Sequence, residues 1–177
     1  MHDEQLRYPI GKYKQPEVIT EEQVQHWIEE IAALPADLRR TVAGMSDEQL
    51  QTPYREGGWK VRQVIHHLPD SHINAYVRFK LALTEQKPTI KPYREDLWGS
   101  LADSERTPID LSLGLLEHLH ARWVVLLNSM TAEDFRRTYF HPEHLKEFTL
   151  AGILGMYAWH GKHHRAQIEA LKERRGW

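Results

Sequence analysis

Two histidines near the carboxyl end of the chain have the spacing of a metal-binding pair. His160 and His164 are four residues apart within residues 149–172, where apolar residues recur at helical spacing. On a helix, the two imidazoles would lie one turn apart on the same face. That face also carries the apolar residues Ile153, Tyr157, Ile168 and Leu171. The spacing therefore predicts two inward-facing imidazoles that could bind one metal ion together with further ligands.

The best candidate for a third ligand is His67, in a second helical segment over residues 60–85. A polar stripe borders the apolar face of this segment, and its members are His67, Ser71, Asn74 and Arg78. The neighbouring His66 would project about 100° away from His67 and is a weaker candidate. Three neutral imidazoles would leave coordination positions open for water or substrate, as in catalytic zinc sites. Spacing alone leaves a second interpretation open, in which these are core histidines satisfied by hydrogen bonds.

Other polar residues could support such a site without binding the metal. His120 could reach the ligands from a third helix. Ser71, Asn74 and Arg78 could orient a substrate or a water molecule, and a structural hydrogen-bond network is the alternative. His163 would point away from both ligands on its own helix, which favours a surface or supporting role.

No catalytic side chain is identifiable from the sequence. The chain has no cysteine, which excludes thiolate nucleophiles and thiolate metal ligands. It contains no HExxH motif, no phosphate-binding glycine loop and no recognisable Ser-His-Asp arrangement. The general base stays unknown, and any chemistry would depend on the metal, with water or a second substrate as the attacking group.

The elements that must position these residues are mostly helical. Amphipathic periodicity predicts four long helices, over residues 20–42, 60–85, 107–130 and 149–172. Pro35 could end or kink the first helix. The third helix should turn one face inward, formed by Leu111, Leu115, Leu119, Trp123, Leu126 and Met130. Four such helices predict an all-α fold, a four-helix bundle in a single domain spanning residues 1–177.

The segments between the helices have different expected structures. Residues 1–19 lack periodicity and predict an extended arm, and residues 86–107 predict a long connection containing Pro88 and Pro92. Residues 137–148 predict one short hairpin.

Composition limits the classes of partner. The net charge of −2 gives no reason to expect nucleic acid or an anionic membrane as a partner. The longest uncharged run is far shorter than the roughly 20 residues needed to cross a bilayer. The amino terminus is charged and has no apolar signal core. A cytoplasmic location is therefore the expectation.

Three stretches of the chain resemble a known family. Residues 58–68 (GWKVRQVIHHL), followed by Asp70-Ser71-His72, are similar to the first motif of the DinB-like bundle superfamily, in which the histidine of a His-Leu pair binds metal. Residues 74–85 (NAYVRFKLALTE) and 159–168 (WHGKHHRAQI) resemble the YfiT-type metal-dependent hydrolases of Gram-positive bacteria. Lys60 departs from the Ser or Thr usual at the start of this helix, but no ligand is affected.

The resemblance implies a metal site and an assembly. It places the ligands at His67, His160 and His164, with one Zn²⁺ or Ni²⁺ per chain, although imidazole ligands by themselves suit several transition metals. It also implies a cytoplasmic homodimer acting on a small-molecule substrate.

Three functions fit this expectation. The first is a metal-dependent hydrolase. The second is a metal-dependent S-transferase that joins bacillithiol, or another low-molecular-weight thiol, to an electrophile. The third is a stress protein that binds a metal or ligand without catalysis. The first two need the same open three-nitrogen site, so the sequence does not separate them.

Overall fold

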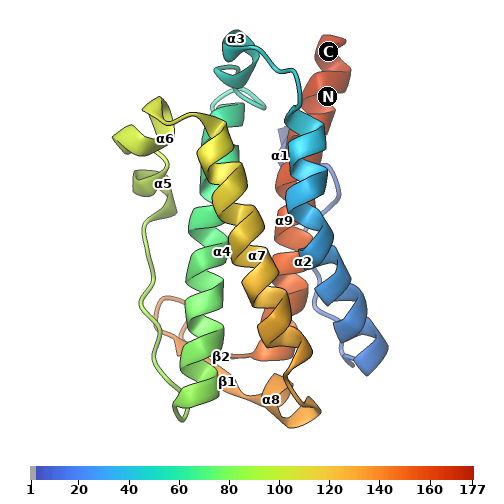
Figure 1. Cartoon of the computed structure of the whole chain (residues 1–177), viewed down its shortest axis with the longest axis vertical. Helices are drawn as coiled ribbons and strands as arrows, with labels where there is room; N and C mark the ends of the chain where they lie inside the picture. Colours follow the sequence, from blue (N-terminus) through green and yellow to red (C-terminus); the bar gives the residue numbers. More distant parts are fainter. Residues whose placement is uncertain (1–2) are drawn as a thin grey trace.

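The computed structural model describes residues 3–177 and has four long helices packed side by side (Figure 1). They are α2 (Glu21–Val42), α4 (Val61–Thr84), α7 (Ile109–Asn128) and α9 (Leu150–Arg175). Helices α2 and α4 each pack against both α7 and α9. The first and last run in one direction and the middle two run in the other (Figure 1). The predicted all-α four-helix bundle is confirmed.

Short elements precede or join the long helices. They are α1 (Asp3–Arg7), α3 (Asp47–Leu50), α5 (Glu95–Trp98), α6 (Ala102–Arg106), α8 (Ala132–Arg136), β1 (Thr138–His141) and β2 (Lys146–Thr149). The two strands pair antiparallel, with Thr138 opposite Thr149 and His141 opposite Lys146. The predicted hairpin is therefore present. Among the described residues, no helix combines the length and the apolarity needed to cross a bilayer.

Side-chain caps explain where the long helices begin. The hydroxyl oxygens of Thr20 and Thr149 accept backbone N–H groups at 3.2 Å and 3.1 Å, respectively, and start α2 and α9. Lys60 offers no such oxygen at the start of α4. There the side-chain oxygen of Gln63 accepts the Lys60 N–H at 3.0 Å, which is half of a capping box.

The long connection between α4 and α7 has a topological cause. The two helices run in the same direction, so the chain must return along the whole bundle before α7 can begin (Figure 1). Helices α5 and α6 interrupt this return, where the sequence predicted only an irregular segment. Gln63 donates to the Gly99 carbonyl at 2.7 Å and Arg62 donates to the Glu105 carbonyl at 2.6 Å. These bonds attach the connection to the first turn of α4.

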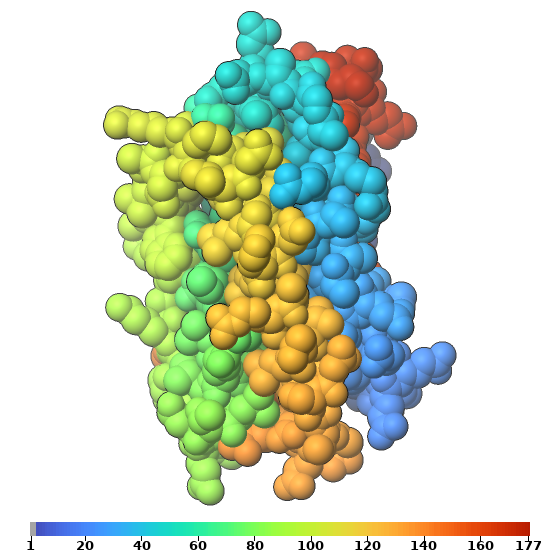
Figure 2. Space-filling view, in the orientation of Figure 1, coloured from blue at the N-terminus to red at the C-terminus, as the bar shows by residue number. Residues whose placement is uncertain are grey.

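The predicted inward face of α7 is partly wrong. Leu111 and Leu115 are 65% and 47% exposed, and Figure 2 shows α7, in yellow to orange, running over the surface of the molecule. The buried residues are Leu113, Leu116, Leu119, His120, Trp123 and Leu127. Leucines occur on several sides of this helix, so two faces have helical periodicity. Packing against α2 and α4 decides which of them is buried.

The amino-terminal arm is also more structured than predicted, because α1 begins it and hydrogen bonds then fix it along α9. Gln167 donates to the Arg7 carbonyl at 2.9 Å, and the Trp159 indole donates to the Gly11 carbonyl at 3.2 Å. Residues 1–2 of the predicted arm lie outside the described residues. The arm therefore covers the side of α9 that carries His163.

The apolar core consists of two clusters along the bundle. One cluster includes Trp27, Ile31, Phe79, Trp123 and Leu154, and the other includes Leu38, Ile65, Leu68, Leu116 and Ile168. The clusters are interrupted on α4 between residues 68 and 75, on α7 between residues 116 and 123, and on α9 between residues 158 and 168. Histidines occupy all three gaps, at His72, His120, and His160 with His164. A layer of imidazoles thus divides the core.

Candidate metal centre

The structure brings His67, His160 and His164 together. One ring nitrogen from each lies within 4.8 Å of the others, and the Nε2 atoms of His67 and His160 are 3.2 Å apart. Nitrogen ligands around a tetrahedral zinc ion, with bonds of 2.0–2.1 Å, are separated by about 3.3 Å. The donor set therefore fits a divalent ion of this size.

Local packing holds these rings in place. The indole of Trp59, just before α4, meets the His67 ring edge-on at 4.7 Å between centroids and lies parallel to the His164 ring at 6.5 Å. On the opposite side of α9, a Cβ atom at Gly161 would overlap the side chain of Leu34 on α2. Glycine there permits the close approach that fixes α9 with its histidines turned toward α4.

Burial keeps the candidate ligands neutral. Desolvation lowers the pKa of His67 to about 4 and holds the pKa values of His160 and His164 well below the usual histidine range, with further lowering from the neighbouring imidazoles. A neutral imidazole has a free lone pair, which a metal ligand requires. The three rings are therefore ready to bind metal at neutral pH.

A pocket of about 330 Å³ opens onto the three histidines. Arg7 and Arg55 contribute positive charge to its wall, and Glu95 on α5 is the one carboxylate among its lining residues. Tyr8 and Trp59 add aromatic surface. The lining therefore combines two guanidinium groups, one carboxylate and aromatic surface.

His72 is a further member of the site that the sequence interpretation missed. Its side chain is fully buried. Its Nε2 lies 3.2 Å from Nδ1 of His160, and its Nδ1 lies 2.8 Å from Nε2 of His120. Nδ1 of His120 lies 2.6 Å from the Ile31 carbonyl oxygen on α2. His120, predicted to support the ligands, thus stands two hydrogen bonds from His160.

A sequence signal for His72 did exist. The core stripe of α4 consists of Val61, Ile65, Leu68, Ala75, Phe79 and Ala82, and residue 72 fills the gap in its helical spacing. A histidine on an otherwise apolar stripe needs hydrogen-bond partners inside the protein.

A second set of contacts supports His164. Its Nδ1 lies 2.9 Å from Oε1 of Gln167, while the Gln167 amide nitrogen lies 3.0 Å from Nε2 of His163. His163 is only 6% exposed and stacks on Trp159 at 4.5 Å. The surface position allowed for His163 is wrong, because the amino-terminal arm covers it; its supporting position agrees with the prediction.

The remaining polar stripe of α4 lies away from this pocket. Arg78 is 8% exposed, and its Nη1 donates to the Tyr157 hydroxyl at 3.5 Å. Asn74 donates to the Asp70 carbonyl of its own helix at 2.8 Å, and Ser71 is buried. None of these three lines the pocket at the histidines. Their part in substrate binding stays a prediction.

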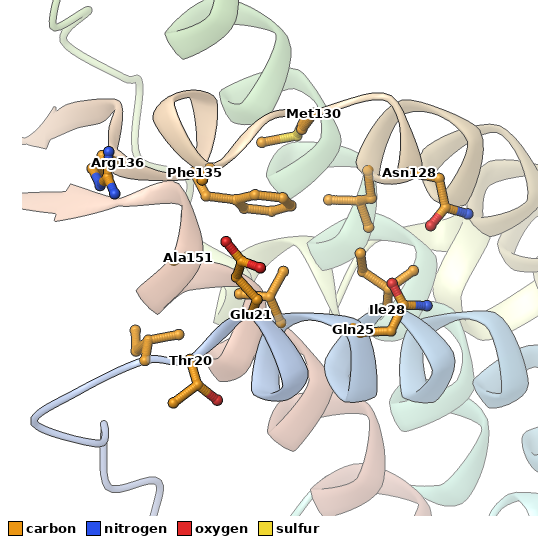
Figure 3. Close-up of a pocket in the computed structure, with 13 residues that line it drawn as sticks. Thr20, Glu21, Gln25, Ile28, Asn128, Met130, Phe135, Arg136 and Ala151 are labelled. Atoms are coloured by element: carbon orange, nitrogen blue, oxygen red, sulfur yellow. The ribbon is translucent and has the colours of Figure 1, made fainter.

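A larger cavity, of about 410 Å³, lies among α2, α7, α8 and the start of α9 (Figure 3). Phe135 and Met130 cover one side of it, and Ile28 and Gln25 face them from α2 (Figure 3). Its lining contains one carboxylate, Glu21, and no histidine. This cavity therefore offers no set of metal ligands.

Comparison with known proteins shows which family the chain belongs to. The family model for the DinB superfamily matches residues 30–168. The chain belongs to the DinB superfamily. The match contains all three candidate ligands together with His72 and His120.

Two close members of the DinB superfamily are informative. A protein of Bacillus cereus (strain 03BB102), named "Putative metal-dependent hydrolase", is 54% identical over 172 residues, which cover 97% of this chain and 98% of the relative. YfiT from Bacillus subtilis, described as "a probable metal-dependent hydrolase with an unusual four-helix bundle topology", is 50% identical with a TM-score of 0.96. That match covers 98% of this chain and 99% of YfiT.

A more distant solved structure has the same fold. It is a mycothiol-dependent maleylpyruvate isomerase, 15% identical with a TM-score of 0.65, and the match covers 82% of this chain and 60% of the isomerase. At this identity the likeness shows the shared fold alone.

Proposed function

We propose that the protein is a metal-dependent hydrolase whose ion is held by His67, His160 and His164. The observation that carries this proposal is the convergence of three neutral ring nitrogens within 4.8 Å on an open pocket. The names of the B. cereus and B. subtilis relatives support the same activity. A divalent ion there would supply Lewis acidity toward a carbonyl oxygen or a water molecule.

The protein's own residues have separate tasks in this proposal. Arg7 and Arg55 line the pocket and bind an anionic group of the substrate. Glu95 is the one carboxylate among the lining residues, and we assign it as the group that would accept a proton from an attacking water. Glu95→Gln should then lower kcat by roughly 100-fold or more with little change in KM. An unchanged kcat would remove Glu95 from the mechanism.

The test of the hydrolase begins with metal content. Protein purified without chelator should contain about one divalent metal per chain, and elemental analysis would decide between Zn²⁺ and Ni²⁺. The metal-loaded protein should hydrolyse activated esters or amides, and His164→Ala should lose both metal and turnover. His66→Gln is a matched control, because His66 is buried on α4 but pairs with Ser112 at 2.7 Å, outside the cluster.

A thiol S-transferase is the second candidate. The chain has no cysteine of its own, and two arginines in the pocket wall favour an anionic co-substrate. Turnover of an epoxide or a chloronitroarene would then require an added low-molecular-weight thiol, such as bacillithiol, and would saturate with it. Failure of the metal-loaded protein in both assays, with metal tightly bound, would favour a non-catalytic binding protein.

A further inference from the structure

We propose that His72 and His120 are positioning residues that set the tautomer of His160, in a hydrogen-bond chain that starts at the Ile31 carbonyl. The chain runs from Ile31 through His120 and His72 to His160, and is called the histidine chain below. The inference rests on the proposed metal site for its purpose. The hydrogen-bond order itself can be tested without any metal.

The histidine chain begins with a proline inside a helix. Pro35 lies within α2, which continues past it to Val42. In an α-helix the carbonyl of residue i accepts the N–H of residue i+4, and proline has no N–H. Pro35 therefore removes the helical donor of the Ile31 carbonyl. His120 Nδ1, 2.6 Å away, supplies a donor in its place.

The carbonyl fixes every proton along the chain. A carbonyl oxygen only accepts, so Nδ1 of His120 must carry the hydrogen, and the Nε2 of this neutral ring is then an acceptor. His72 Nδ1, at 2.8 Å, must donate to that acceptor, which leaves the Nε2 of His72 without a hydrogen. His160 Nδ1, at 3.2 Å, donates in turn to His72.

The result at the end of the chain is a bare Nε2 on His160. This is the atom that approaches Nε2 of His67 at 3.2 Å within the candidate metal cluster. An imidazole free of such contacts favours the opposite tautomer, with its hydrogen on Nε2. The histidine chain therefore holds His160 in the less favoured form, which is the form that can bind metal through Nε2.

A shorter path gives His164 the same tautomer. The amide nitrogen of Gln167 donates to the Arg7 carbonyl at 2.9 Å, which orients the amide. Oε1 of Gln167 then accepts the hydrogen on Nδ1 of His164 at 2.9 Å and leaves its Nε2 bare. Two ligands on one helix are thus oriented from two different backbone carbonyls, one on α2 and one on α1.

The rings of the histidine chain have little freedom to rearrange. His72 and His120 are 0% and 1% exposed, so water does not compete for their nitrogens. Their ring centroids are 4.9 Å apart with 22° between planes, so the two rings lie nearly in one plane, as an in-plane hydrogen bond requires. Trp123 meets both rings edge-on, at 6.0 Å and 5.9 Å. Metal-ligating histidines held through their second nitrogen in this way bind metal more tightly.

The first experiment uses the metal-free wild-type protein. Long-range ¹⁵N–¹H correlation spectra should show His120, His72 and His160 with the hydrogen on Nδ1. An Nε2–H tautomer at His120, His72 or His160 would overturn the proposed order, whatever any variant does.

The second experiment uses His120→Phe, which keeps an aromatic ring at a residue two hydrogen bonds away from His160. The His160 tautomer should shift toward Nε2–H, and zinc affinity, measured by competition with a chromogenic chelator, should fall about 10- to 100-fold. His66→Gln should change neither quantity. A folded His120→Phe protein with unchanged His160 tautomer and zinc affinity would overturn the proposal.

Pro35→Ala tests the start of the chain and leaves every histidine in place. The new N–H competes for the Ile31 carbonyl, so zinc affinity should fall several-fold while α2 becomes more stable. Unchanged affinity would show that the proline has no part in the chain.

A protein that has the predicted tautomers but binds no zinc would refute the proposed metal site and leave the histidine chain standing.

Discussion

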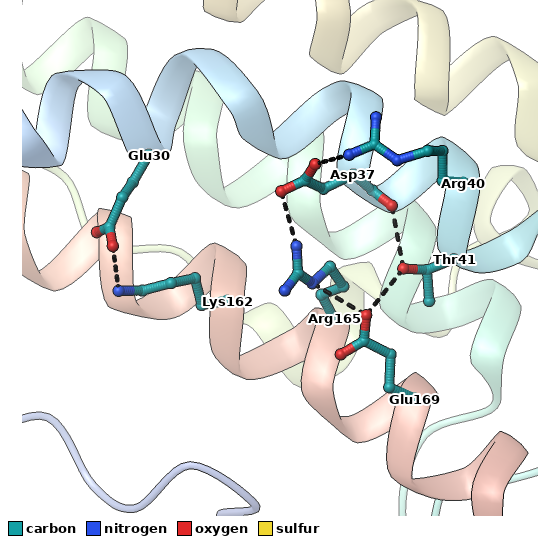
Figure 4. A network of polar contacts seen from close by, with 7 residues as sticks. All are labelled: Glu30, Asp37, Arg40, Thr41, Lys162, Arg165 and Glu169. Carbon is teal, nitrogen blue, oxygen red and sulfur yellow. Dashed lines mark hydrogen bonds and ion pairs between the residues drawn. The ribbon is translucent and has the colours of Figure 1, made fainter.

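The two long sides of α9 carry different kinds of polar group. Toward the outer edge of α2, α9 presents charged residues, with Lys162 paired to Glu30 at 2.5 Å and Arg165 paired to Asp37 at 2.7 Å (Figure 4). The side chains of Lys162 and Arg165 remain 43% and 30% exposed. Toward α4, the same turns present His160 and His164, which are neutral and connected to buried partners.

The difference shows how solvent decides what a polar side chain can do. The ion pairs at this edge stay partly exposed to solvent, so each one adds little to stability and tolerates change. Polar groups in a dry layer must be satisfied inside the protein, which restricts both their orientation and their protonation. The first side of α9 attaches it to α2, and the second side carries the candidate metal ligands.

Removal of a ligand on the inner side should have the largest effect. His160→Ala deletes one of three nitrogens, and zinc binding should weaken by at least about 1,000-fold, since two imidazoles make a poor site. Lys162→Ala, on the outer side of the same turn, is the matched control and should keep wild-type affinity. Calorimetric titration with zinc measures both. Equal losses of zinc affinity in the two variants would show that the two sides of α9 do not differ in metal binding.

Acid should destabilise the dry layer. Burial lowers the pKa of His120 to about 4, against about 6.5 in an unfolded chain. Between pH 4 and pH 6.5 the unfolded state binds a proton at this residue and the folded state does not. The free energy of unfolding is therefore unaffected by this residue above pH 6.5 and decreases as the pH falls toward 4. The loss from this residue is roughly 3 kcal/mol.

Urea unfolding of the metal-free protein at pH 7 and at pH 4.5 would measure this dependence. His120→Phe should show a shallower loss of unfolding free energy over the same interval. A variant with the wild-type pH dependence would mean that His120 is not held neutral by the fold.

Metal removal should destabilise the bundle without unfolding it. Zinc at 100 times its Kd would add about 2.7 kcal/mol of stability by mass action, and a chelator should lower the Tm accordingly. The two apolar clusters remain, so helical circular dichroism at room temperature should persist. Complete unfolding by the chelator would make the metal structural and would count against the hydrolase.

The smallest effect is expected on the outer side. Arg165→Ala removes the pairs with Asp37 and Glu169, and partly exposed pairs of this kind contribute about 0–1 kcal/mol. Zinc affinity should not change. A measurable loss of zinc binding would show that the position of α9 depends on these ion pairs. The two sides of α9 would then not be independent.

Much of the fold could be predicted because its signals are local. The four apolar periodicities and the hairpin depend on residues close in sequence, and all appear in the structure. Local signals failed on α7, where leucines on several sides support two faces equally. Contact with α2 and α4 then decided that Leu111 and Leu115 are exposed.

For the site, the sequence by itself determined which histidines share a helix face. Residues four apart, such as His160 and His164, are neighbours on one face of any helix. The polar stripe on α4 indicates His67 as the third candidate ligand. The tertiary structure decided the hydrogen-bond partners, since His72, His120 and Ile31 come from three different helices. Hydrogen-bond order depends on distances of about 3 Å between residues far apart in the chain, and only the packed bundle sets those distances.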